Sequence, residues 1–439
     1  MKKRIVLELV LMLILLSTTA CSTATETVEK NQADFSNKSI ANNGMKIEPD
    51  EGLEIITNPN EFTKVTEKQE YNFETDCQNQ FSELIDYNDC IETEEAYIFL
   101  RYSRLFAFNK STRKYYILCD NPSCNHKYTD SCSAFINGVK GIEYYDGNLY
   151  AVINETKADE GGKAINTLEL YKMSLNGHDR EKVCQIATAL DVKGMDTNTF
   201  TVRCAVIHRG YLYYMYSYGV GETEDSYYVN HSNTLYRISL TGDSEAECIC
   251  AMKYGGDENN LDISCQGSYV YFVQTEELKY GGGYLYRLNT ESMKLEYMDI
   301  GGVWGGYTVI GNEIVYIEED GSYYAYNMDT EKKYEFIKPE PVEGLEHGYT
   351  VYDGRYFYIL LYNMQTHKRY WETYTLQKTK IDQYECSRII HEKDTGTCFI
   401  EHVGAGSDFD FMVAADGSEL MYLDKNQLGS GAVEFVLAE

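Results

Sequence analysis

The feature that most constrains the fold of this chain is an internal repeat: a glycine turn followed by a Tyr-rich strand. It reads DGNLY at 146–150, RGYLY at 209–213 and DGRYFY at 353–358. The turn glycines lie 43 to 63 residues apart, at Gly147, Gly210, Gly267, Gly311, Gly354 and Gly417. Short Tyr/Val/Ile-rich runs separated by Gly and Asn or Asp predict strands joined by hairpin turns.

A second motif follows the first in most copies of the repeat. It reads LYKMSLNG at 170–177, LYRISLTG at 235–242 and LYRLN at 285–289, and a further short strand comes after each. A repeat of roughly 40–50 residues with about four strands is typical of a β-propeller blade. The sequence therefore predicts an all-β propeller of seven blades, with six or eight as alternatives. The predicted units are 86–119, 138–184, 203–250, 262–300, 304–337, 346–390 and 397–437.

The distribution of apolar residues favours a propeller over a two-sheet sandwich. A sandwich strand alternates apolar and polar residues, because one of its faces meets solvent. Strand 211–216 is apolar on both faces: Leu212, Tyr214 and Tyr216 share one, and Tyr211, Tyr213 and Met215 share the other. A sheet packed between two neighbouring blades requires this pattern. Tyrosine suits it, because its ring packs while its hydroxyl reaches a polar partner.

The turn and strand motifs over residues 138–380 resemble a family of bacterial surface lipoproteins with a Tyr-rich β-propeller. That family is distantly similar to propellers of the low-density-lipoprotein-receptor type, although this chain lacks the receptors' Tyr-Trp-Thr-Asp motif. The resemblance implies a propeller and an extracytoplasmic location. It implies no activity.

The first twenty residues have the pattern of a secretory signal peptide. Met1 to Arg4 is basic, Ile5 to Leu16 is mostly apolar, and Ser17 to Ala20 is small and precedes Cys21. The apolar run is shorter than the roughly 20 residues that span a bilayer. A cysteine after small residues is similar to a bacterial lipobox, which predicts cleavage before Cys21 and a lipid on its thiol. The alternatives are ordinary cleavage with secretion and an uncleaved anchor.

Three segments follow from these patterns: a signal peptide at 1–20, a lipidated disordered tether at 21–50 and a propeller at 51–439. The tether is rich in Thr, Ser, Asn and Glu, and such composition buries too little apolar surface to fold. We therefore expect a protein at the cell membrane, anchored by lipid and facing the extracytoplasmic side. The formal charge of −30 argues against nucleic acid as a partner, because phosphate backbones would be repelled.

No catalytic motif accompanies the repeats. The sequence contains no Gly-x-Ser-x-Gly elbow, no His-Glu-x-x-His motif and no phosphate-binding loop. The predicted function is therefore a binding or interaction module with a protein, peptide or glycan ligand, and the alternative is a carbohydrate-active or other hydrolytic propeller. Most of the 41 tyrosines are expected to pack between blades. The rim candidates for ligand contact are Tyr216, Tyr218, Tyr227 and Tyr228.

Twelve cysteines remain when Cys21 is set aside, and an even number in an exported chain favours disulfides. Several are predicted to end the outer strand of one blade or to begin the next. The candidate pairs are Cys184 with Cys204, Cys250 (or Cys248) with Cys265, and Cys386 with Cys398. The alternative is buried thiols that pack as small apolar side chains.

The densest group of chemically active residues lies between the first two predicted blades. Cys119, Cys124, His126 and Cys132 fall within fourteen residues, and Pro122 predicts a turn among them. Three thiols and an imidazole suffice to surround a structural zinc ion. The competing interpretations are a Cys119–Cys132 disulfide and unlinked thiols. No other cofactor is predicted.

The two ends of the propeller are predicted to meet. We expect a strand or packing segment from residues 51–90, including the alternating stretch 63–73, to lie against the C-terminal strand 433–436. Such a contact would close the ring and leave no open edge.

Overall fold

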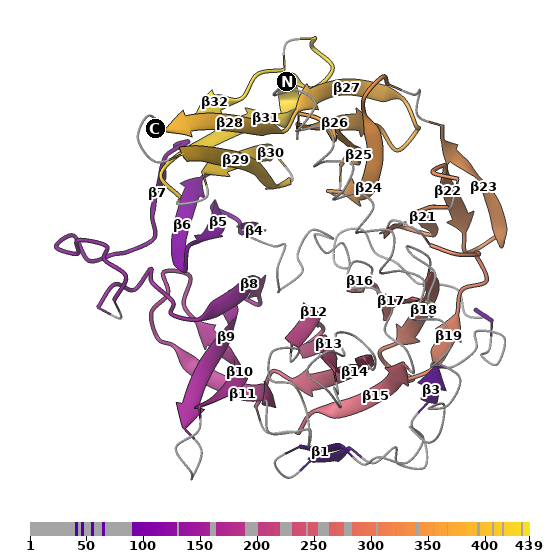
Figure 1. Cartoon of the computed structure of the whole chain (residues 1–439), viewed down its shortest axis with the longest axis horizontal. Helices are drawn as coiled ribbons and strands as arrows, with labels where there is room; N and C mark the ends of the chain where they lie inside the picture. The colour runs from indigo at the N-terminus through magenta and orange to yellow at the C-terminus, as the bar shows by residue number, and fades with distance from the viewer. Residues whose placement is uncertain are drawn as a thin grey trace, which may run out of the picture.

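The computed structural model of the chain shows a closed ring of seven β-sheets (Figure 1). The structure describes residues 40–42, 45–47, 54–56, 64–65 and 90–439, and within the last range it leaves out 130, 159–163, 189–200, 220–230, 243–244, 253–262, 276–282, 304–305, 319, 339–341, 354, 367, 393–395, 406–407, 415–416 and 432. Among the described residues, no helix has the length and apolar character needed to cross a membrane.

The first four blades are each built on four consecutive antiparallel strands. Blade 1 comprises β4 (Cys90–Glu92), β5 (Ala96–Arg101), β6 (Arg104–Asn109) and β7 (Tyr115–Ile117). Blade 2 comprises β8 (Val139–Tyr145), β9 (Asn148–Ala158), β10 (Ala164–Met173) and β11 (Glu181–Thr188). Blade 3 comprises β12 (Thr201–His208), β13 (Tyr211–Gly219), β14 (His231–Ser239) and β15 (Glu247–Met252). Blade 4 comprises β16 (Ile263–Gln266), β17 (Tyr269–Thr275), β18 (Gly283–Asn289) and β19 (Leu295–Tyr297).

The remaining three blades complete the ring. Blade 5 comprises β20 (Tyr307–Ile310), β21 (Glu313–Ile317), β22 (Tyr323–Asn327) and β23 (Lys332–Ile337). Blade 6 comprises β24 (Glu346–Tyr352), β25 (Phe357–Tyr362), β26 (Arg369–Tyr374) and β27 (Lys380–Glu385). Blade 7 comprises β28 (Ser387–Glu392), β29 (Gly396–Ala405), β30 (Phe409–Ala414) and β31 (Leu420–Asp424), with β32 (Val436–Leu437) outside them. The predicted seven-bladed propeller is confirmed. One boundary was wrong, because β28 opens blade 7 and does not close blade 6.

The glycine turns of blades 2 and 3 are tight hairpins. Asp146 and Gly147 have φ of 46° and 76°, and Arg209 and Gly210 have φ of 47° and 81°. Two successive residues with positive φ suit the turns whose twist matches that of the flanking strands. Glycine adopts this conformation without the steric penalty of a Cβ atom, and this explains why it occupies the second position of both turns.

Blade interfaces form the hydrophobic core, and strand β13 shows why both of its faces are apolar. Leu212 and Tyr214 pack in a cluster with Leu170 and Ile186 of blade 2. Tyr213 and Met215 pack on the opposite side, in a cluster with Val270 and Phe272 of blade 4. The predicted division of this strand into two buried faces is confirmed for these four residues.

An aromatic cluster closes the ring between blades 7 and 1. Phe411 of blade 7 lies 4.8 Å from Tyr97 and 5.1 Å from Phe99, measured between ring centroids. The C-terminal strand β32 pairs with β31, and the last carbonyl of the chain, at Glu439, accepts a hydrogen bond from Tyr115 N–H of blade 1. The C-terminal residues therefore join the outer edges of the two blades.

The prediction that the N-terminal segment meets the C-terminal strand was wrong for the residues that the structure describes. Strand β3 (Glu54–Ile56) pairs in parallel with β15, at the outer edge of blade 3. Farther along, Val65 N–H donates to the Tyr297 carbonyl of blade 4, and Lys64 pairs with Asp299. The segment thus covers two exposed sheet edges, which would otherwise present unpaired backbone groups.

Buried polar contacts link the innermost strands of blades 2 and 3. The Glu143 carboxylate accepts a hydrogen bond of 2.9 Å from Ile207 N–H, and complete burial raises the pKa of this carboxyl well above its ordinary value. The folded protein therefore holds Glu143 protonated at pH values at which the unfolded chain ionises it. Because of this difference in pKa, the free energy of unfolding decreases as the pH rises above about 4.3, the ordinary pKa of glutamate.

We therefore expect Glu143→Gln to stabilise the protein in a pH-dependent manner. The amide oxygen can still accept from Ile207 N–H, while the cost of keeping a carboxyl protonated disappears. The melting temperature should rise by about 2 °C at pH 8 and by less at pH 5. The control is Glu94→Gln, the same change at an exposed position, whose melting temperature should stay close to that of the parent. A melting temperature for Glu143→Gln that is lower at pH 8 than that of the parent would contradict this account.

Candidate metal centre

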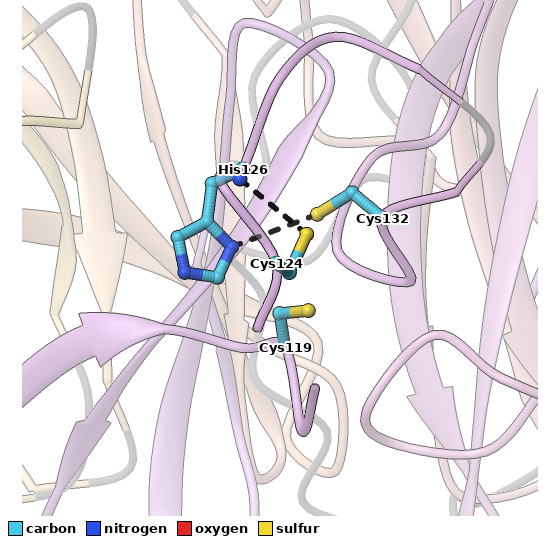
Figure 2. Close-up of side chains that lie close together, drawn as sticks. All are labelled: Cys119, Cys124, His126 and Cys132. Carbon is cyan, nitrogen blue, oxygen red and sulfur yellow. Dashed lines mark hydrogen bonds between the residues drawn. The ribbon is translucent and has the colours of Figure 1, made fainter. Parts of the chain in front are cut away.

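Cys119, Cys124, His126 and Cys132 converge on one point (Figure 2). Their ligand atoms all lie within 4.8 Å of one another. Within the part of the chain that the structure describes, this is the one such group of His, Cys, Asp and Glu side chains. It belongs to the connector from Leu118 to Gly138, between β7 of blade 1 and β8 of blade 2, which extends outward from the ring in Figure 1.

A tight turn brings the first three of these residues together. Cys124 N–H donates to the Asn121 carbonyl at 3.0 Å, and the side chain of Asn121 accepts from Ser123 N–H. The turn predicted around Pro122 is thus confirmed. His126 then adopts a left-handed conformation, with φ of 52°. This reversal places its backbone N–H 3.4 Å from Cys124 Sγ and turns the imidazole back toward the thiols (Figure 2).

Cys132 reaches the cluster from the returning half of the connector. Its N–H donates to the Thr129 carbonyl, and its own carbonyl accepts from Phe135 N–H. The side chain is completely buried in the apolar cluster between blades 1 and 2, against which Cys119 and Cys124 also pack. Its Sγ lies 3.8 Å from Nδ1 of His126. The site is therefore half embedded in the core, and only its outer half meets solvent.

The donor set and its spacing fit a zinc ion. A Zn–S bond of about 2.3 Å in a tetrahedron places neighbouring ligand atoms about 3.8 Å apart. The observed ligand atoms need only small movements to reach this geometry from separations of at most 4.8 Å. Three cysteines and one histidine would fill all four positions and leave none for water or substrate, so the chemistry of this donor set is structural.

The cluster perturbs two of its own thiols in opposite directions. Burial raises the pKa of Cys119, but hydrogen bonds from the Asn121 backbone and from Ser133, Cys124 and Cys132 outweigh it and lower this pKa to about 6. Burial, together with the hydrogen bond to Cys124, raises the pKa of Cys132 to about 11. The lowered pKa favours the thiolate form of Cys119 within this compact group of sulfur atoms.

The connector is fastened to the β10–β11 hairpin of blade 2 by contacts that the sequence did not predict. His178 Nε2 lies 2.8 Å from the carboxylate of Asp120, the residue after Cys119. Arg180 donates to the carbonyls of Ser133 and Phe135, at 2.8 and 2.6 Å. A Cβ atom on Gly177 would lie 2.3 Å from the Ser133 carbonyl oxygen, so only glycine permits this close approach. These partners lie far apart in the sequence, so no local motif predicted their contacts.

The predicted disulfides are not formed among the cysteines that the structure describes. Cys119 and Cys132 are separate thiols that face His126, and Cys250 and Cys265 pack as thiols in one apolar cluster between blades 3 and 4. Cys184 and Cys248 are also thiols, with burial raising the pKa of each to about 12. Cys386 is a buried thiol. Its proposed partner Cys398 and the partner of Cys184, Cys204, have side chains outside the described residues.

The other predicted site residues receive no structural description of their side chains. Tyr216 and Tyr218 lie on β13 by backbone alone, whereas Tyr227 and Tyr228 fall outside the described residues. Cys21 and the predicted signal peptide and tether up to residue 39 also lie outside them. The structure therefore brings together the four predicted metal ligands. The lipidation of Cys21 and the ligand contacts of the rim tyrosines remain predictions.

No protein-family model matches the chain, and no curated protein does. Among solved structures, it is similar to BamB from Moraxella catarrhalis, with 12% identity, a TM-score of 0.34 and coverage of 74% of this chain and 77% of that one. It is similar to a protein assigned as a 6-phosphogluconolactonase from Bacteroides fragilis, with 14% identity, a TM-score of 0.42 and coverage of 82% and 96%. It is also similar to the cobalt-substituted ACO of Synechocystis, with 9% identity, a TM-score of 0.40 and coverage of 72% and 74%. At these levels the similarities do not bear on function.

Proposed function

We propose that this protein is an extracytoplasmic binding or interaction module, held at the cell membrane by a lipid on Cys21. The connector between blades 1 and 2 is the observation that carries the binding role. It runs from Leu118 to Gly138, which is longer than the roughly 15 residues beyond which loops without secondary structure are uncommon and usually functional. Loops on a rigid scaffold are where binding residues concentrate.

The metal cluster supports a binding role for this connector over a catalytic one. A zinc ion with four protein ligands holds a loop in one shape but has no open position for chemistry. Fixing a loop in advance lowers the entropy that a ligand must otherwise overcome on binding. The proposed site is therefore a rigid recognition loop, fastened to blade 2 through Asp120 and Arg180.

An array of glycans and peptides, probed with the purified zinc-loaded protein, tests the binding role. We expect retention of a discrete ligand class. We also expect retention to fall when Cys124→Ser removes a zinc ligand, because the loop then loses its fixed shape. Failure to retain any glycan or peptide, or turnover of a retained glycan by the wild-type protein, would overturn the proposal.

Membrane attachment is tested separately by Cys21→Ser. Without the thiol no lipid can be attached, and one lipid anchor with its diacyl chains accounts for stable membrane association. The variant should therefore move from the membrane pellet to the soluble fraction or the medium. A variant that stays in the pellet, and is still cleaved before residue 21, would show that the lipid is not the anchor.

A further inference from the structure

Exposed tyrosines surround the proposed recognition loop. Tyr128 on the loop is 56% exposed, and Tyr102 in the β5–β6 turn is 61% exposed. The loop lies against that turn, because Ile136 N–H donates to the Ser103 carbonyl and Phe135 forms a β-bridge with Arg104. The two tyrosines therefore belong to one surface, which we call the Tyr128 platform: Tyr102, Arg104, Lys127 and Tyr128.

The ring of Tyr128 is fixed although it is exposed. The guanidinium carbon of Arg104 lies 4.5 Å from its centroid, and Phe135 meets it edge-on at 5.8 Å. Arg104 is itself positioned by Phe106, whose ring lies 5.5 Å away. The cation lies over one face of the ring, so a ligand would stack on the surface of the ring that stays exposed. A ring already held in place by a cation and a second ring costs little further ordering on binding.

The platform is basic in a strongly acidic protein. Its four residues include two cations, Arg104 and Lys127, and no carboxylate, whereas the formal charge of the chain is −30. Lys127 is exposed, and no ion pair joins it to a carboxylate of the described residues. Screening at physiological salt limits interactions to about 8 Å, so a ligand at this surface responds to the local positive charge.

We propose that the Tyr128 platform binds an acidic polysaccharide, a glycan whose sugar rings carry carboxylates. This inference rests on the proposed binding function and names its ligand class. The positive C–H edges of a sugar ring complement the negative face of Tyr128, and a carboxylate on the same ring would pair with Lys127. Charge pairing and ring stacking thus both favour a sugar ring that carries a carboxylate, which is the repeating unit of an acidic polysaccharide.

Other polyanions fit less well. An acidic peptide that binds by adding a strand needs a free sheet edge. Outer strand β7 offers only three residues, and Tyr115 N–H already donates to Glu439. A nucleic acid duplex carries a charge per roughly 1.7 Å of axis, so the acidic remainder of the protein would repel it more strongly than a chain with one charge per sugar ring.

Binding of polygalacturonate to the zinc-loaded protein, measured by titration calorimetry, tests the inference. Tyr128→Ala should weaken the affinity by about tenfold, as expected for an aromatic anchor, and Lys127→Ala by about threefold. Tyr128→Phe keeps the ring and should bind as the parent does. Lys338→Ala, which removes an exposed lysine in the distant blade 5, should also leave binding unchanged. Zinc content and the far-ultraviolet spectrum confirm that each variant is folded.

Matched polymers separate the outcomes. Fully methyl-esterified polygalacturonate, which has the same backbone without charge, should not bind. Equal affinity for polyglutamate or for a DNA oligonucleotide would overturn the inference, because charge alone would then explain binding. Equal binding by Tyr128→Ala would overturn it as well. If no acidic polymer binds but the array retains a neutral glycan or a peptide, this inference fails while the proposed function stands.

Discussion

Protein purified without chelator is expected to contain about one zinc ion per chain, held by Cys119, Cys124, His126 and Cys132. Cys124→Ser and His126→Ala should each lose the ion, because three remaining ligands do not hold a structural zinc as four do. Elemental analysis of the purified variants measures the stoichiometry. The matched control is Cys184→Ala, a half-buried thiol of blade 2 outside the cluster, which should retain the full equivalent.

Removal of the ion should also destabilise the contact between blades 1 and 2. A ligand present at a thousandfold excess over its dissociation constant stabilises the folded state by about 4 kcal/mol. The buried position of Cys132 in the core between these blades transmits that effect to the ring. Chelation should therefore lower the melting temperature and, by loosening the loop, speed tryptic cleavage after the already exposed Lys127. Protein without zinc, in which Cys119 and Cys132 are recovered as one linked peptide, would instead establish the disulfide.

The propeller could be predicted from sequence because each blade repeats the same local signals. A glycine turn recurs in the sequence of blades 2 to 7, so an error in one copy is corrected by the others. Local signals failed at the N-terminal segment for a clear reason. Glu54–Ile56 pairs with β15, yet the outer edge of each blade presents similar backbone groups, and three residues carry too little pattern to choose among them.

The metal cluster was predictable for a different reason, since its four ligands lie close together in the chain. Spacing alone did not distinguish a metal site from a Cys119–Cys132 disulfide. That distinction depends on the left-handed conformation of His126, which turns the imidazole toward the thiols. The contacts of Asp120 with His178, and of Arg180 with the loop carbonyls, come from the neighbouring blade and were not predicted.

A buried charge pair between blades 6 and 7 was not predicted from the sequence. Lys425 lies in a short 3-10 helix, η3 (Lys425–Gln427), where lysine is ordinarily exposed. Its side chain is instead completely buried and pairs with the equally buried carboxylate of Asp353. That carboxylate also accepts from Tyr358 OH at 2.7 Å and from the N–H groups of Arg355 and Tyr356.

Lys425→Met should be among the most destabilising single substitutions in the protein. The change keeps most of the apolar stem but removes the positive charge, which leaves Asp353 buried without its cation. Breaking a buried pair in this way typically costs about 3–5 kcal/mol. Chemical denaturation at neutral pH, followed by tyrosine and tryptophan fluorescence, measures the loss as a lower transition midpoint.

Two further variants distinguish a buried charge from a general packing defect. Asp353→Asn combined with Lys425→Met removes both charges and retains an oxygen that can accept from Arg355 and Tyr356, so it should recover a substantial part of the loss. Lys368→Met breaks an ion pair with Glu385 that is exposed to solvent, and water and salt already weaken such pairs. Its midpoint should equal that of the parent. If the double variant is no more stable than Lys425→Met alone, the cost lies in packing around residue 425, and Asp353 does not depend on its partner.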